Sequence, residues 1–192
     1  MKKTIIIVVS VLVVIAIVIG GIFIFNKEEK PVVSMETSQD LESIINSVNE
    51  KANLPLRSLS TTTVDISNEM TLTSYTGLKS TEGIEQVVVS EPMITSQAYS
   101  LVLVKVADNA DVEAIKKEML DNVDVRKWIC VTAEKVYVTN YQDLICLVMS
   151  SEELAKPVYN AFKEVVQGKV GTELERTTEE AYEEQPGEIV AY

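Results

Sequence analysis

The pattern of hydrophobic and polar positions divides the chain into an apolar N-terminal run and a longer mixed remainder. Residues 5–25 contain no charged side chain, and a helix of that length spans about 31 Å, close to the roughly 30 Å hydrocarbon core of a bilayer. A cleaved signal peptide is the alternative, with residues 18–20 resembling a cleavage site, but such apolar regions usually end after about 7–15 residues. We expect a cytoplasmic tail at 1–4, an uncleaved transmembrane anchor at 5–25 and a linker at 26–36.

The charges that flank this run favour a cytoplasmic N-terminus. Lys2 and Lys3 precede the run, whereas Lys27 and Lys30 follow it, so the margin given by basic residues alone is small. A very short tail before the first span is typical of a signal anchor. We therefore expect a single-pass protein of the cell membrane with its C-terminal domain outside the cytoplasm.

Beyond the linker, helical and strand periodicities alternate along the chain. Apolar residues at helical spacing predict helices that begin near Thr37, Asp111 and Ser151. Alternating or continuous apolar positions predict strands at 64–66, 70–72, 84–90, 99–107, 128–131, 135–139 and 144–150. This order predicts an α+β domain at 37–168, in which helices pack on a mainly antiparallel sheet. Pro157 predicts a kink or a restart in the last helix.

Charge is strongly acidic and concentrates toward the C-terminus. The chain has 29 acidic and 17 basic residues and a net charge of −12, which disfavours nucleic acid as a partner. The simplest interpretation is a solvating surface, and contact with a cationic polymer or divalent ions is the alternative. The glutamate-rich segment 169–192 has few apolar residues, which predicts a disordered tail.

The chain contains no histidine. This excludes Ser-His-Asp and Cys-His catalysis and every histidine-ligated metal site. We find neither a glycine-rich phosphate loop nor a calcium-loop motif, so we expect no cofactor and no metal. Thr76 and Lys79 have the spacing of a hydroxyl–lysine pair found in some acyl-transfer enzymes. That pair, or a pair of carboxylates, leaves an envelope enzyme as a weaker alternative to a binding module.

Cys130 and Cys146 are the only cysteines, and both lie in apolar runs that are typical of a buried core. A regular hairpin about residues 141–142 would place Cys146 opposite residues 135–137, too far from Cys130 for a disulfide. We therefore expect two buried free thiols. A break in the chain at 132–134 would leave the disulfide open as the alternative.

Three side chains are candidate contacts for a ligand or a partner: Glu91, Ser96 and Trp128. Glu91 and Ser96 lie in the connection to the strand at 99–107, whose two apolar faces predict a central position in the sheet. They could line a cleft, although an ordinary turn is the simpler interpretation. Trp128, next to two basic residues, predicts either a recognition tip or a core side chain flanked by solvated charges.

Three segments carry a resemblance to a known family: 91–93, 96–105 and 126–134. They resemble an uncharacterised bacterial family of small single-span membrane-anchored proteins with an extracytoplasmic domain of unknown function, and the resemblance covers residues 40–167. It implies the same topology and is compatible with a role in modifying an envelope polymer, but it identifies no active residue. We expect a membrane-tethered accessory module that contacts an envelope protein or polymer. A structural spacer or a homo-oligomeric component is the other alternative.

Overall fold

A six-stranded sheet forms the centre of the computed structural model, which describes residues 32–56, 58–94 and 96–178. Its strands are β1 (Leu59–Thr63), β2 (Ile84–Pro92), β3 (Tyr99–Val106), β4 (Lys135–Tyr141), β5 (Leu144–Ser150) and β6 (Leu174–Thr177). They lie in the order β1-β2-β3-β5-β4-β6, and all neighbours are antiparallel. The predicted α+β class with a mainly antiparallel sheet is confirmed.

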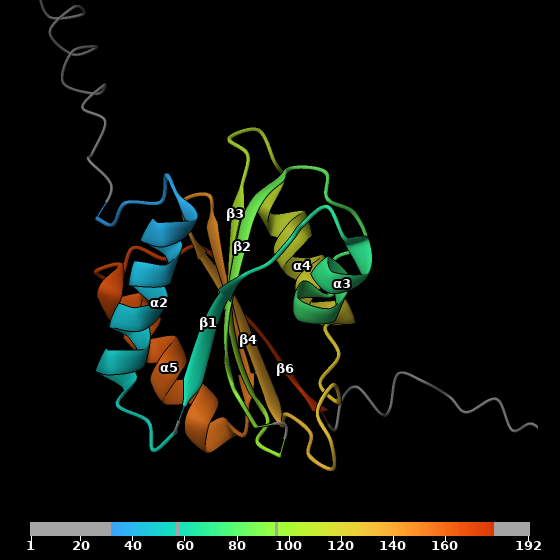
Figure 1. The fold of residues 1–192 in the computed structure, drawn as a ribbon. Helices are drawn as coiled ribbons and strands as arrows, with labels where there is room; N and C mark the ends of the chain where they lie inside the picture. The colour runs from blue at the N-terminus through green and yellow to red at the C-terminus, as the bar shows by residue number, and fades with distance from the viewer. Residues whose placement is uncertain (1–31, 57, 95, 179–192) are drawn as a thin grey trace, which may run out of the picture. The chain divides into compact units, whose positions relative to one another are not determined.

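Two helices cover each face of this sheet (Figure 1). Helices α2 (Ser38–Ala52) and α5 (Glu152–Val165) pack on one face, and α3 (Glu69–Thr76) and α4 (Val112–Asn122) pack on the other. Side-chain oxygens of Thr37, Asn68 and Asp111 accept hydrogen bonds from the first-turn N–H groups of α2, α3 and α4. These caps determine where the helices begin, because the first N–H groups of a helix have no partner within it.

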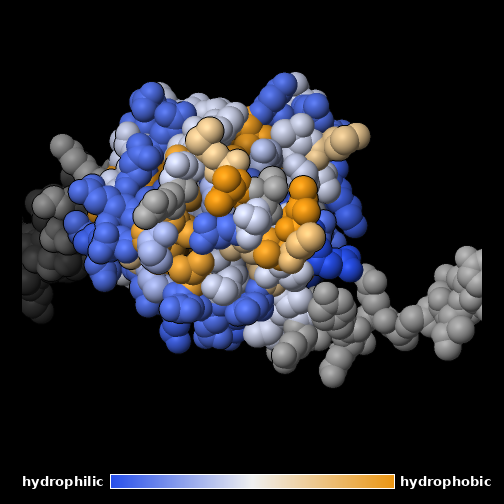
Figure 2. Space-filling view, turned by 60° about the horizontal axis from the view of Figure 1, so that its bottom comes forward, coloured by the Kyte–Doolittle hydropathy of each residue, from blue (hydrophilic) through white to orange (hydrophobic). Residues whose placement is uncertain are grey.

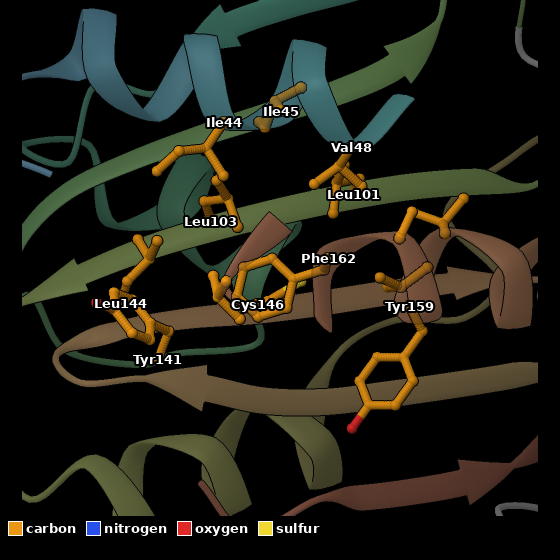
Figure 3. Packing of buried hydrophobic residues seen from close by; sticks show 14 of the residues in the cluster. Ile44, Ile45, Val48, Leu101, Leu103, Tyr141, Leu144, Cys146, Tyr159 and Phe162 are labelled. Carbon is orange, nitrogen blue, oxygen red and sulfur yellow. The ribbon is translucent and has the colours of Figure 1, made fainter. Parts of the chain in front are cut away.

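The core under α2 and α5 is built from helix side chains that pack against one face of the sheet, which alternate residues of each strand form. Figure 3 shows Ile44 and Val48 of α2 above Leu101 and Leu103 of β3, with Phe162 of α5 beside Cys146 of β5. Ile45, Tyr141, Leu144 and Tyr159 belong to the same cluster. Since Tyr99, Leu101 and Leu103 alternate along β3, the other parity of that strand is free to pack on the opposite face.

The second core lies under α3 and α4. Val102, Val104 and Val106 of β3 point to it, together with Leu72 of α3 and Met119 of α4. Seven of the eight residues of β3 and all residues of β5 are buried. The prediction that the strand at 99–107 is central and covered on both faces is therefore confirmed.

Three predicted strands are wrong. The segment at 64–66 is not a strand; it follows β1, which occupies Leu59–Thr63. The segment at 70–72 belongs to α3, because the Asn68 side chain accepts a hydrogen bond from the N–H of Thr71 and starts a helix. In that helix Leu72 is buried while Met70 is 82% exposed, so the period-two pattern was accidental. The segment at 128–131 belongs to the irregular connection between α4 and β4.

The acidic segment after residue 168 differs from prediction over its described part. Leu174–Thr177 forms β6, which pairs with β4 at the edge of the sheet. The Arg176 guanidinium donates to the backbone carbonyls of Asp121 and Val123 at 3.0 Å each, tying this strand to the end of α4. A disordered tail beginning at 169 is therefore wrong for residues 169–178, and 179–192 lie outside the described residues. Helix α5 continues through Pro157 without a restart.

The predicted anchor at 5–25 and the first residues of the linker also lie outside the described part of the chain. Within residues 32–56, 58–94 and 96–178, no helix is both long enough and apolar enough to cross a membrane.

The sheet has two ends with different connections. At one, which we call the entry end, the described chain begins, and the N–H of Val32 donates to the Tyr141 hydroxyl at 2.7 Å, next to the turn between β4 and β5. At the other, the loop end, the β2–β3 connection meets the α4–β4 connection near Ser150. In Figure 1 the loop end of the sheet is at the bottom of the view.

Candidate functional site: the loop end of the sheet

Lys127 is the centre of a side-chain cluster at the loop end. Its ammonium forms an ion pair with Glu91 at the end of β2, and the two side chains are only 15% and 23% exposed. Lys127 Nζ also lies 4.8 Å from the ring centre of Tyr75 and 5.2 Å from that of Trp128. It donates a hydrogen bond to Ser100 Oγ at 3.4 Å. A lysine on the α4–β4 connection thereby joins α3, β2 and β3.

Burial and charge act in opposite directions on this cluster. Burial of the ammonium lowers the pKa of Lys127, and the nearby Glu91 and Asp124 carboxylates oppose that shift. Burial, with the charge of Glu91, raises the pKa of the Tyr75 phenol. The ion pair and the ring contacts link the α4–β4 connection to β2 and α3. The arrangement is therefore suited to holding these segments together.

Exposed apolar side chains gather around this cluster. The described residues include four large hydrophobic side chains that are strongly exposed, and three of them lie on the two loops of this end. Met93 and Ile94, which follow β2, are 74% and 57% exposed, and Ile129, which follows Trp128, is 65% exposed. Figure 2 brings this end forward and shows hydrophobic residues gathered among hydrophilic ones. We call Met93, Ile94, Trp128 and Ile129 the loop-end surface.

The structure brings together two of the three candidate contact residues and separates the third. Glu91 and Trp128 both contact the Lys127 ammonium, one by charge and one by its ring. Ser96 is exposed in the β2–β3 connection and takes no part in this cluster. Trp128 is half-buried and packs against the second core. The interpretation of its neighbours as solvated charges is wrong for Lys127 and correct for Arg126, whose side chain is 64% exposed.

Lys127, Tyr75 and Ser100 are members of the cluster that the sequence did not single out. A lysine next to a tryptophan usually lies at the surface, and nothing local indicates that Glu91, 36 positions earlier, approaches it. The spacing of Glu91 from the buried valines of β2 was the only available signal. It places this carboxylate on the face that α3 and α4 cover.

The Thr76/Lys79 pair does not have the geometry of a nucleophile and its base. Thr76 is fully buried, and its hydroxyl donates to the Leu72 carbonyl at 2.7 Å and accepts from the Leu78 N–H at 3.1 Å. Lys79 is exposed, and its backbone N–H donates to Glu118. The threonine hydroxyl thus closes the end of α3, a common structural role for this residue type.

The two cysteines are free and differ in exposure. Cys146 is fully buried in β5, and burial raises the pKa of its thiol. Cys130 is exposed beside Ile129, with a left-handed backbone (φ 61°). The prediction of two buried thiols is therefore wrong for Cys130, because the segment that carries it is a loop and not a strand.

Two other polar features lie outside this cluster: the buried Lys116 and an open cavity. The buried Lys116 contacts Glu113, Asn140 and the Thr172 carbonyl at 2.7–2.9 Å, which anchors the chain that precedes β6. An open cavity of about 640 Å³ near the C-terminal ends of α2 and α5 is lined by Lys51, Asn160, Lys163, Glu164, Gln167 and Gly168. Its two lysines are paired with Glu164 and Glu173. In the described part of the chain, no three Cys, Asp or Glu residues gather as metal ligands.

Comparison with known proteins adds no further assignment: no protein-family model, curated protein or solved structure matches this chain. The function therefore has to be inferred from the site itself.

Proposed function

We propose that this protein is a membrane-tethered extracytoplasmic binding module that contacts an envelope component through its loop-end surface. The observation that carries the proposal is the concentration of exposed apolar side chains on two loops that a half-buried ion pair holds together. Contiguous exposed apolar side chains with a polar rim are typical of sites of protein association. The uncharged run at 5–25 supplies the tether.

The polar chemistry supports binding over catalysis. Lys127 is neutralised by Glu91, and the Thr76 hydroxyl is occupied by the backbone of α3. The aromatic rings of Tyr75 and Trp128 lie against the ammonium, and aromatic side chains are enriched in the centres of protein interfaces. A role as an accessory to envelope polymer modification fits such a module.

The topology can be tested with a native residue. Because Cys130 is exposed and Cys146 is buried, a membrane-impermeant maleimide should label intact cells at one site per chain, and Cys130→Ser should abolish the label. The chain should also remain in the membrane pellet after alkaline carbonate extraction. Labelling that requires cell lysis, or release into the soluble fraction, would refute the tethered extracytoplasmic arrangement.

The binding surface can be tested on the full chain in mild detergent. Ile94→Glu and Ile129→Glu should each shift the solubilised protein from a larger assembly to its own size in gel filtration. The matched control is Met70→Glu, since Met70 is also strongly exposed, on α3, but lies outside the loop-end surface. An assembly that survives both loop substitutions, or dissociates with Met70→Glu alone, would place the contact elsewhere.

A further inference from the structure

Three kinds of occupant could cover the loop-end surface: the lipid bilayer, a second copy of this chain, or a different protein. The choice depends on the charges that accompany the apolar residues at the loop end. The inference rests on the proposed function, since it takes the tether and the loop-end surface as given.

Charge argues against the bilayer. The exposed carboxylates at the loop end outnumber the exposed basic side chains there. Anionic lipid head groups attract basic segments and repel acidic ones, which disfavours contact of the loop-end surface with such a membrane.

Charge argues against a second copy. Four exposed carboxylates lie on segments of the loop end: Asp124 and Glu134 on the α4–β4 connection, and Glu152 and Glu153 at the start of α5. Two exposed basic residues oppose them, Arg126 near Asp124 and Lys156 near Glu152, while Lys127 and Lys135 are held by Glu91 and Glu175. Two copies meeting through this surface would bring like-charged rims together, which disfavours association.

We propose that the loop-end surface binds a second envelope protein through an apolar patch rimmed by lysine or arginine. The side chains of Met93, Ile94 and Ile129 supply the apolar contact, and Trp128 precedes Ile129 on the connection that Lys127 fixes. Glu134 and Glu153, which have no basic ion-pair partner among the described residues, supply the charges that the partner's rim meets. Charge complementarity of this kind selects the partner and fixes its orientation.

The test uses the full chain in living cells with a photo-crosslinking amino acid, p-benzoylphenylalanine, at residue 94, at residue 129, or at residue 70 as the control. We expect adducts of one common mass, different from twice the chain mass, from residues 94 and 129, and at least a fivefold lower yield from residue 70. In the same background, Glu134→Lys with Glu153→Lys should lower the adduct yield by roughly fivefold or more. Glu36→Lys with Glu50→Lys, two exposed positions before and within α2, is the matched control and should leave the yield unchanged.

Each other outcome overturns a defined part. An adduct at twice the chain mass would identify a second copy, and phospholipid adducts found by mass spectrometry would identify the membrane. A heterologous adduct that is indifferent to the Glu134/Glu153 reversal would refute the basic rim while leaving the binding surface intact. No adduct from either loop, with the exposed Cys130 thiol still reactive and the fold retained, would refute the proposed function itself.

Discussion

The ion pair between Lys127 and Glu91 should be energetically coupled, and a double-mutant cycle can measure that coupling. The side chains are 15% and 23% exposed, so the pair lies between an exposed pair, worth about 0.2–1 kcal/mol, and a buried pair, where removal of one partner costs about 3–5 kcal/mol. Lys127→Met leaves Glu91 without its cation and removes two contacts to aromatic rings. We expect it to lower the free energy of unfolding by about 2–3 kcal/mol.

Glu91→Gln should cost less, because the aromatic rings continue to stabilise the unpaired ammonium. We expect a loss of about 1–2 kcal/mol. In the double variant no unpaired charge remains, so its cost should fall short of the sum of the single costs by about 1–2 kcal/mol. Each value is small enough for a domain with two cores of this size to remain folded.

The assay is urea unfolding of the domain from Val32 onward, which contains both cores, at neutral pH with linear extrapolation. Lys117 and Asp121 form a matched control pair at 2.8 Å on α4, with side chains 73% and 49% exposed, and their coupling should be about 0.3–0.5 kcal/mol. A Lys127–Glu91 coupling energy no larger than that of the control pair, or a Lys127→Met variant that is more stable than the parent, would refute the interpretation that this half-buried ion pair stabilises the fold.

Three further predictions concern the fold around the site. Gly77→Ala should lower the free energy of unfolding by at least about 2 kcal/mol in urea unfolding, because Gly77 has φ 77° and an added Cβ would lie 2.5 Å from a backbone nitrogen of the α4–β4 connection. Gly168→Ala is the control and should cost about half as much or less, since Gly168 has φ 73° but open space around it. Equal losses of stability in the two variants would contradict this prediction. Cys130 should react with a thiol reagent in the native protein, and Cys146 only after unfolding. Two reactive thiols in the native protein would be inconsistent with a buried Cys146. Hydrogen bonds from Tyr159 and Lys163 lower the pKa of Glu173 in the folded protein, so the stability that Glu173 contributes is present above its unfolded pKa and is lost as the pH falls through its folded pKa. The loss of unfolding free energy caused by Glu173→Gln should therefore shrink in acid. A loss that does not depend on pH would argue against these hydrogen bonds.

Long-period patterns were sufficient to predict the main elements. The strands at 84–92, 99–106, 135–141 and 144–150 and the helices at 38–52, 112–122 and 152–165 agree with their predicted positions within a few residues. Each contains enough apolar residues to bury a whole face, and burial dominates the free energy of such segments. Short segments failed. Leu72 and Met70 have too few neighbours to distinguish a strand from the first turn of a helix, and the Asn68 cap decided the outcome.

β6 was missed for a different reason. Leu174–Thr177 contains only one large apolar residue and lies in a glutamate-rich context, so composition favoured disorder. Its stability comes from partners distant in sequence: the β4 ladder, and the Arg176 guanidinium on the carbonyls at the end of α4. A strand that pairs with an existing sheet edge through backbone hydrogen bonds can form without a periodic apolar pattern. The charge and composition of the segment alone therefore do not predict it.

The same limit applies to the candidate site. Trp128 and Glu91 were each conspicuous on local grounds, yet the residue that joins them, Lys127, looked like an ordinary surface lysine. Its environment depends on the approach of α3, which was predicted as a strand, and on the loop that follows α4, which was predicted as another. A site made by two connections therefore becomes visible only when both connections are placed.

The antiparallel order of the sheet explains why these connections meet. β2 runs from the entry end to the loop end, and β3 returns, so residues 93–98 must turn at the loop end. α4 then carries the chain back along the face of the sheet, and β4 starts opposite the last residue of β5, so residues 123–134 also turn there. Both long loops and their exposed apolar side chains thus lie at the end of the sheet opposite Val32, where the described chain begins. Lengthening either loop should alter what the domain contacts before it alters either core, because neither loop contributes a strand to the sheet.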